Sequence, residues 1–370
     1  MKSCQRLCIS IIAISTCLWL VFFYTRTANY FNYDNDKEGN PLKTKLFVKR
    51  CTYADVLKRI SKTHVAKCNK GIMTPKRHTG IIRTVTRKVQ FVNSTAMTHV
   101  KMSMECYKEL PKCLIIGIQK CGTLALAEFL RIHPDIAIDA RQTYFFSSNY
   151  SKGLTWYLDQ LPCSQKGQIT MERTPQYFYM RESPWRVFSA RRDMKLLIIV
   201  CNPVKRTISN FAMAQYRNRE HRNARFEEEV FNINEENFTV NDNSLYVDKS
   251  RYAKHLQKWL EYFPRSQLHV IDGQRFTQFP AQELTKIERF LGLRPYINQS
   301  CFVYNKRSGF YCLRNNTDVS SVTNIKCLPP TKGRPHPLIG KTYLERLKQY
   351  FSPQNDVFFN LIMMKNWFQW

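Results

Sequence analysis

The chain has 370 residues, 44% of them apolar, which excludes a chain too polar to build a core and allows one large domain or two small ones. It carries 57 Lys and Arg against 28 Asp and Glu, for a formal net charge of +29. Such a surface attracts polyanions, namely nucleic acid, anionic lipid or acidic polysaccharide, and charge alone does not choose among them.

The N-terminus contains an apolar segment that predicts a membrane anchor. Lys2 and Arg6 precede Leu7–Phe23, a run of about 17 residues, which is the short end of a membrane-spanning helix. A cleaved signal peptide is the alternative, but bulky residues up to Tyr24 stand where a small-residue cleavage site would lie. We therefore expect an uncleaved signal anchor within residues 1–24, a cytosolic N-terminus and a lumenal remainder.

Cysteines and glycosylation motifs agree with a lumenal chain. Cysteines recur beyond the anchor, which is compatible with disulfides in an oxidising compartment. Cys312 and Cys327 flank a polar segment and are the best candidate pair, whereas the other pairings cannot be read from the sequence. Motifs for N-glycosylation occur at Asn93, Asn149, Asn237, Asn298 and Asn315. A lumenal chain argues against a nuclear nucleic-acid binder.

The chain divides into a basic stem and a compact domain. Residues 25–112 are polar, basic and weakly periodic, and they predict a stem that holds the following domain, residues 113–370, off the membrane. Buried strands are expected at Leu114–Ile118, Leu196–Val200 and Leu268–Ile271. Helices are expected at Leu124–Arg131, Val204–Tyr216, Tyr252–Tyr262 and Ala281–Leu291, the last ending at Gly292. This alternation predicts an α/β fold, with a central parallel sheet covered by helices on both faces.

Two strand-to-helix turns carry residues expected of an anion site. The first is Lys120–Thr123, and the second lies in "LLIIVCNPVKRTISNF", residues 196–211, where Pro203 and Ser209 belong to the start of a helix. Helix N-termini bind anions, a lysine adds a point charge, and parallel sheets bind ligands beyond the carboxyl ends of their strands. Neither turn is the loop that cradles a nucleoside triphosphate, and either alone fits an ordinary connection. With the basic segment "KGRPHP" at Lys332–Pro337, they predict a nucleotide with more than one phosphate-like group.

A set of short segments occurs in a fixed order along the domain, namely "QKCGTLAL", "HPDIAI", "YFFS", "GLTWYL", "ERTPQYF", "NPVKRTISNF", "FPRSQLHVIDGQRF", "IERFLGL", "GFYCLR" and "KGRPHP". Together they resemble the heparan sulfate glucosaminyl 3-O-sulfotransferases of the wider Golgi sulfotransferase family, over nearly all of Cys113–Trp370. The resemblance implies a P-loop-like sulfotransferase fold, 3'-phosphoadenylyl sulfate (PAPS) as sulfuryl donor and heparan sulfate as acceptor. It also implies a single-pass type II position in the Golgi membrane, and it predicts no metal.

The resemblance assigns the first turn to the 5'-phosphosulfate of the donor. Lys120 would neutralise the charge that grows on the leaving phosphate oxygen, while backbone amides and the Thr123 hydroxyl would cradle the rest. Ser209 matches a serine that binds the 3'-phosphate. The turn comprises Lys120, Cys121, Gly122, Thr123 and Leu124. The further donor contacts that the resemblance implies are Tyr311, Lys332, Gly333, Arg334, Pro335 and His336.

Several positions depart from the family pattern. Gln142 stands where the family has its catalytic glutamate, and a neutral amide orients a hydroxyl but does not accept its proton at neutral pH. On the donor side, Cys201 replaces the arginine expected next to the 3'-phosphate, and Cys121 and Leu124 replace a glycine and an arginine. The other acceptor-side departures are Tyr144 for a histidine, Ser147 for an aspartate and Arg173 for a lysine.

Three interpretations follow from these departures. The first is a working PAPS-dependent sulfotransferase in which Asp139 or Glu172 supplies the missing base. The second is a pseudoenzyme that binds donor or heparan sulfate without turnover. The third is a Golgi structural or heparan-binding partner that has lost donor binding too. We adopt the first as the prediction, because the fold-level analogy favours an enzyme.

Overall fold

The structure, a computed structural model, describes residues 83–86, 105–218, 221–314, 325–329, 333 and 335–368. All of them belong to the second of two compact units, Arg77–Trp370. The predicted anchor Leu7–Phe23 and most of the predicted stem lie outside these ranges. Within these ranges, no helix has the length and apolar character needed to cross a membrane.

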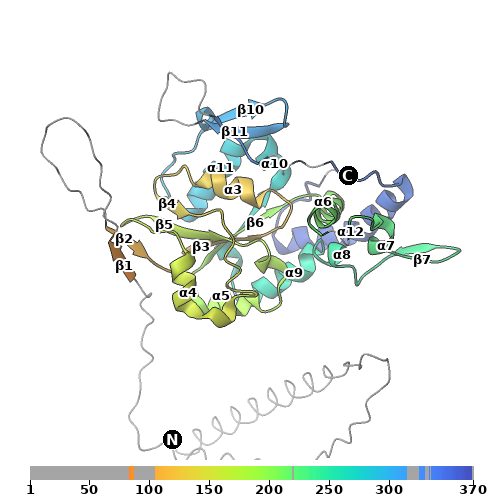
Figure 1. The fold of residues 1–370 in the computed structure, drawn as a ribbon, viewed down its shortest axis with the longest axis horizontal. Coiled ribbons are helices and arrows are strands. Elements are labelled where there is room, and N and C mark those ends of the chain that lie inside the picture. The colour runs from red at the N-terminus through yellow and green to blue at the C-terminus, as the bar shows by residue number, and fades with distance from the viewer. Residues whose placement is uncertain are drawn as a thin grey trace, which may run out of the picture. The chain divides into compact units, whose positions relative to one another are not determined.

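The centre of the fold is a five-stranded parallel sheet (Figure 1). Neighbouring strands pair in parallel throughout, which confirms the predicted sheet type. The three predicted strands correspond to β3, β6 and β9. The sequence did not predict β4, which is very short, or β5, which carries polar residues. In spatial order the strands are β4 (Ile136–Ile138), β5 (Ile169–Arg173), β3 (Cys113–Gly117), β6 (Lys195–Val200) and β9 (Leu268–Asp272).

Helices bury both faces of this sheet, which explains the continuous apolar runs of its central strands. Side chains alternate between faces, so Leu114 and Ile116 of β3 join one hydrophobic cluster while Cys113 and Ile115 join the other. The first cluster is covered by α4 (Gly153–Gln160), α5 (Ser183–Ala190) and α9 (Tyr252–Leu260). The second is covered by α3 (Thr123–Leu130), α10 (Gly273–Gln278) and α11 (Pro280–Leu291). Gly292 ends α11 with a φ of 77°, as the pattern predicts.

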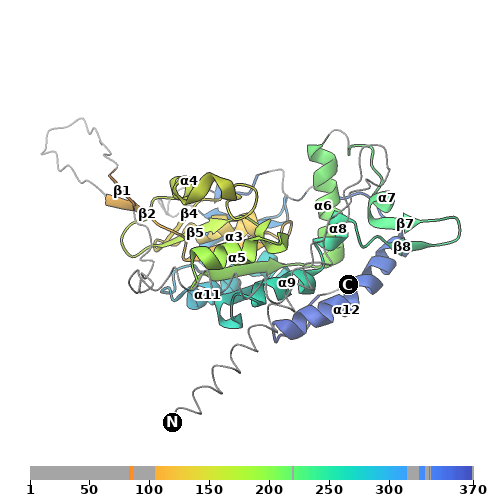
Figure 2. The same cartoon turned by 90° about the horizontal axis from the view of Figure 1, so that it is seen from below.

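A third hydrophobic cluster involves α6 (Pro203–Arg217), α7 (Phe226–Val230), α8 (Leu245–Asp248) and α12 (Lys341–Leu361), which lie at one end of the sheet in Figure 2. It joins Phe211 to Phe351, which come from helices distant in sequence. The long C-terminal helix also reaches the first cluster through Phe358. The third cluster also includes side chains of the antiparallel hairpin of β7 (Phe231–Ile233) and β8 (Phe238–Val240).

Two small antiparallel sheets complete the described fold, and each carries a disulfide. The first pairs β1 (Arg83–Thr86) with β2 (Glu105–Lys108), and its Cys106 is bonded to Cys163, ahead of β5. The second contains β10 (Phe302–Asn305), β11 (Phe310–Arg314) and β12 (Ile325–Lys326). There Cys312 and Cys327, the pair singled out from the sequence, are bonded with their Cα atoms 4.4 Å apart. Single 3-10 turns lie at Tyr150–Lys152, Tyr177–Tyr179, Arg265–Gln267 and Gln299–Cys301.

Candidate active site

The first predicted turn connects β3 to α3 at the carboxyl edge of the sheet. The backbone amide of Ile118 donates to the carbonyl of Ile199 at 2.9 Å, and that of Cys121 donates back to Ile118 at 3.1 Å, which closes the turn. Lys120 has a φ of 82° and Gly122 a φ of 102°, so both lie in the left-handed region. The helix that follows has no acidic residue in its first turn. Its N-terminus therefore suits an anion.

The second predicted turn connects β6 to α6. The side chain of Asn202 accepts hydrogen bonds from the backbone amides of Val204, at 3.0 Å, and Lys205, at 3.1 Å. Pro203 occupies the first helical position, where its missing amide costs nothing. Ser209 is half-buried on the same helix. A capped, fixed helix start thus stands beside the first turn.

A disulfide joins these two turns. Cys121 and Cys201 are bonded, with their Cα atoms 5.3 Å apart, although 80 residues separate them in the sequence. The hydroxyl of Tyr252 donates to the carbonyl of Cys201 at 2.9 Å and lies 3.9 Å from the Cys121 sulfur. Two departures that appear separate in sequence are therefore one structural feature. The sequence held one signal for this pairing. Each cysteine follows the end of a strand, and the carboxyl ends of parallel strands meet at one edge of the sheet.

A third turn, between β9 and α10, packs against the first two and was missed by the sequence patterns. The side chain of Asp272 caps α10 by accepting from the amides of Gln274, at 2.8 Å, and Arg275, at 3.1 Å. Gly273 permits the close approach, because a Cβ there would lie 2.6 Å from the carbonyl oxygen of Val200. The sequence alone does not show that Gly273 packs against the first two turns, because this contact depends on the order of the strands in the sheet.

The predicted C-terminal donor segment is described only in part. His336 is exposed, and partial desolvation and then the positive charge of Lys120 lower its pKa. A Cβ on Gly333, which has a φ of 72°, would lie 2.9 Å from the Phe310 ring. Tyr311 follows, with its ring centroid 5.3 Å from that of Tyr304. The remaining residues predicted here, Lys332 and Arg334, lie outside the described residues, and Pro335 is exposed.

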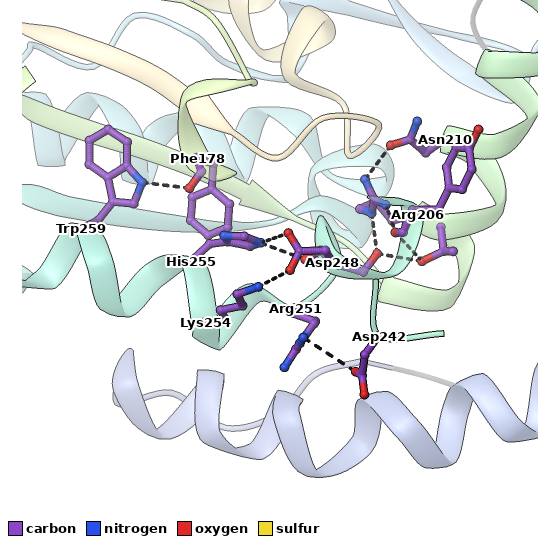
Figure 3. A network of polar contacts seen from close by, with 12 residues as sticks. Phe178, Arg206, Asn210, Asp242, Asp248, Arg251, Lys254, His255 and Trp259 are labelled. Atoms are coloured by element: carbon purple, nitrogen blue, oxygen red, sulfur yellow. Dashed lines mark hydrogen bonds and ion pairs between the residues drawn. The ribbon is translucent and has the colours of Figure 1, made fainter. Parts of the chain in front are cut away.

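A buried arginine holds α6 in place (Figure 3). Arg206 Nε donates to Ser250 Oγ at 2.5 Å, and its Nη1 donates to Asn210 Oδ1 at 3.1 Å. Its Nη2 donates to the carbonyl of Tyr246 at 2.5 Å. These partners are neutral, and burial lowers the pKa of the guanidinium to about 10. The network fixes the helix that carries Ser209 against α8, a role with no distinct sequence signal.

A cavity of about 160 Å³ lies on the predicted acceptor side. Gln142 lines it together with Asp139 and Glu172, the two carboxyl groups considered as alternative bases. Trp156 contributes an indole and is contacted by the ammonium of Lys152, 4.4 Å from its ring centroid. The other lining residues are Arg141, Thr143, Asn149, Gln160, Leu161, Pro162 and Met171. Polar amides, an indole and carboxylates are groups that hydrogen-bond and stack against a sugar.

The two carboxyl groups of the cavity differ in chemistry. Burial raises the pKa of Glu172, which accepts a hydrogen bond from the Thr174 hydroxyl and lies 3.4 Å from the Tyr157 hydroxyl. Burial also acts on Asp139, but hydrogen bonds from the backbone and side chain of Arg141 outweigh it and lower the pKa. Glu172 is therefore the stronger base of the two.

Three residues predicted on the acceptor side, Arg173, Ser147 and Tyr144, take part in hydrogen bonds within the protein. Arg173 is buried, which lowers its pKa, and its Nε donates to the carbonyl of Ala140 at 3.0 Å. The Ser147 hydroxyl donates to the carbonyl of Tyr144 at 3.1 Å, and Tyr144 has a φ of 54°.

Leu124, on the donor side, is half-buried at the start of α3. Over the described ranges, no cluster of three or more potential metal ligands occurs.

Comparison with known proteins defines the class. The sulfotransferase domain family matches residues 110–360, and the chain belongs to that family. The crystal structure of a sulfotransferase from Alicyclobacillus acidocaldarius superimposes with a TM-score of 0.51 at 21% identity, over 70% of this chain and 97% of that chain. At that identity, the match shows the fold alone.

The curated relatives confirm the resemblance found in the sequence. The chain is 39% identical over 254 residues to the heparan sulfate glucosamine 3-O-sulfotransferase 3B1 of Mus musculus, covering 69% of this chain and 64% of that protein. It is 38% identical over 256 residues to the heparan sulfate glucosamine 3-O-sulfotransferase 5 of Homo sapiens, covering 69% and 72%. The chain thus spans somewhat less than two thirds of the mouse protein's length.

Proposed function

We propose that this chain transfers a sulfuryl group from PAPS to a glucosamine residue of heparan sulfate. Family membership supports the reaction class. The observation that carries the proposal is the junction of two strand-to-helix turns at the carboxyl edge of the sheet, with Lys120 on one and Ser209 on the helix after the other. The amides and dipole at the start of α3, together with the dipole of α6 and the Ser209 hydroxyl, fit a nucleotide with phosphates at two positions.

The residues of this junction fit the donor. When bound, PAPS supplies the sulfuryl group and leaves as adenosine 3',5'-bisphosphate. Lys120, the amides of the first turn and the Thr123 hydroxyl would hold the 5'-phosphate and the charge that develops on its oxygen. The N-terminus of α6 and Ser209 would hold the 3'-phosphate. Tyr311 and the segment 332–336 would complete the contacts.

The acceptor would enter from the cavity that Gln142 lines. The amide of Gln142 would orient the acceptor hydroxyl, and Glu172 would accept its proton as the hydroxyl oxygen bonds to sulfur and the donor's sulfur–oxygen bond breaks. The raised pKa of Glu172 makes it a stronger base than an ordinary carboxylate. Arg173, held against Ala140, adds positive charge at the edge of the same region.

Binding without turnover is a second candidate function. It is favoured by the amide at position 142 and by the internal hydrogen bonds of Glu172, which occupy the carboxyl group. The experiment that separates the two is transfer of labelled sulfate from PAPS to heparan sulfate by the purified full-length chain. Transfer above a heat-inactivated control supports the enzyme. Donor or heparan binding without transfer supports the second function.

The position in the cell is also a proposal. Residues 1–24 would form a tail and signal anchor, residues 25–112 a basic lumenal stem, and residues 113–370 the sulfotransferase domain in the Golgi lumen. The +29 charge suits a polyanionic glycan, and Asn237 and Asn298 are exposed, as glycan acceptors must be. Digestion of the expressed chain by an endoglycosidase should increase its electrophoretic mobility. An unglycosylated cytosolic chain would contradict this topology.

A further inference from the structure

The Cys121–Cys201 disulfide stands at the start of both helices that would bind the donor phosphates. Cys121 lies two residues before Thr123, where α3 begins, and Cys201 lies two residues before Pro203, where α6 begins. Each helix start presents the positive end of its dipole to an anion, and α3 adds its first amides, whereas Asn202 already accepts from the first amides of α6. A covalent bond between the two turns therefore sets the separation and orientation of two anion sites.

The same bond constrains the backbone of Lys120. This residue has a φ of 82°, a conformation that non-glycine residues adopt at an energetic cost and keep only where their surroundings impose it. Its neighbour Cys121 is held on one side by the disulfide and on the other by its amide hydrogen bond to Ile118, at 3.1 Å. These two restraints keep the lysine backbone in the turn rather than in a relaxed conformation.

Buried groups around the disulfide make it a fixed point. Tyr252 is 1% exposed, and its hydroxyl binds the carbonyl of Cys201 while lying 3.9 Å from the Cys121 sulfur. On another side, Gly273 brings the third turn against the carbonyls of Val200 and Cys121. The disulfide therefore links two turns whose positions are also fixed in part by the buried residues around them.

We propose that the Cys121–Cys201 disulfide is a positioning element of the donor site. It holds the starts of α3 and α6, and the left-handed backbone of Lys120, in the arrangement that binds one nucleotide through its 5' and 3' phosphates together. The inference rests on the proposed function. Preorganisation of this kind raises affinity by removing the cost of ordering the site when the ligand binds. Its effect should be larger for a bisphosphate, which uses both turns, than for a monophosphate, which uses one.

The test compares two nucleotides on the full-length chain by calorimetry. Adenosine 3',5'-bisphosphate probes both turns, and adenosine 5'-monophosphate probes the first. In Cys121→Ser/Cys201→Ser, affinity for the bisphosphate should fall about tenfold, and the preference for bisphosphate over monophosphate should fall with it. The matched control is Cys106→Ser/Cys163→Ser, which removes a disulfide on the side of the sheet where the strands begin. Its bisphosphate affinity and nucleotide preference should stay within twofold of wild type.

Each other outcome overturns the proposal in a distinguishable way. If the wild-type chain binds no bisphosphate, the proposed donor site is contradicted, and so is the positioning role of the disulfide. Equal affinity in wild type and the Cys121/Cys201 variant, or an equal loss for both nucleotides, would leave the donor site standing and remove the positioning role. Should the serine pair not fold, Cys121→Ala/Cys201→Ala takes its place, because it leaves no hydroxyl in the buried contact. If neither pair folds while the control folds, the bridge serves stability rather than donor binding.

Discussion

The Oε2 atom of Glu172 and the hydroxyl of Tyr157 lie 3.4 Å apart in the buried wall of the cavity that Gln142 also lines. Glu172 is 2% exposed, so its charged form is poorly solvated and its pKa is raised. A carboxyl group in this state links stability to pH and is a stronger base than an exposed carboxylate. Both consequences can be measured.

Stability should fall as the pH rises through the titration of Glu172. Between its ordinary pKa of 4.5 and the raised native value, the native state keeps a proton that the unfolded chain has lost. The free energy of unfolding therefore decreases across this window and stays reduced above it. Glu172→Gln should flatten this part of the pH profile measured by urea unfolding, whereas exposed Glu261→Gln should not. A profile unchanged by Glu172→Gln would contradict the raised pKa.

Glu172→Gln should also lower sulfate transfer by on the order of 10²–10⁴-fold in kcat, the usual contribution of a general base. Affinity for adenosine 3',5'-bisphosphate should be unchanged, because the donor turns are untouched. Tyr157→Phe is the control, since it removes the neighbouring hydroxyl and keeps the carboxyl group. Activity that survives Glu172→Gln would place the base elsewhere, with Asp139 next to be tested.

Gln142→Glu should raise transfer, because it places a carboxylate at the position where the family has its catalytic glutamate. The side chains are nearly the same size, so packing should change little. A gain of up to about 10²–10⁴-fold is expected if proton transfer limits the rate. Tyr144 and Ser147 also depart from the family, so the triple change Gln142→Glu, Tyr144→His and Ser147→Asp is the stricter assay. No gain in the triple variant, with donor binding intact, would show wider divergence of the acceptor side.

Substitutions at Lys120 should separate binding from stability. Lys120→Ala and Lys120→Gly should both weaken adenosine 3',5'-bisphosphate binding by about 1.5–3 kcal/mol, the typical value of a charge-assisted contact. Only glycine adopts a φ of 82° freely, so Lys120→Gly alone should gain about 1 kcal/mol of stability. Calorimetry and thermal unfolding measure the two effects, with exposed Lys112→Ala as the control. If both variants bind adenosine 3',5'-bisphosphate with wild-type affinity, the turn only connects β3 to α3 and does not bind the donor.

Gly273→Ala should destabilise the donor edge of the sheet. The new Cβ would lie 2.6 Å from the carbonyl oxygen of Val200, and backbone on both sides leaves little room to adjust. Such overpacking costs about 1–3 kcal/mol, measurable by urea unfolding. Gly340→Ala is the control, because its nearest contact is the Tyr343 ring at 3.3 Å, the end of a side chain that can move. Equal stability of the two variants would contradict the close approach of the turns.

Local sequence determined the parts of this protein that depend on neighbours along the chain. The apolar runs of β3, β6 and β9 predict strands because both faces of the sheet are buried. Pro203 and Gly292 mark a helix start and a helix end through their backbone preferences. The ordered motifs indicated the sulfotransferase family, and with it the residues proposed for the donor. By contrast, β5 escaped prediction because Thr170, Glu172 and Arg173 are polar, and their burial depends on partners from other elements.

Only the tertiary structure decided what happens between elements. The order β5–β3–β6–β9 places the ends of β3 and β6 side by side, so Cys121 and Cys201 form one bridge instead of two unrelated departures. The same order presses Gly273 against Val200 and gathers Gln142 with Glu172 around one cavity. These contacts join residues far apart in the chain, and no periodicity or spacing encodes them, because the distance between such residues is set by how the strands pair.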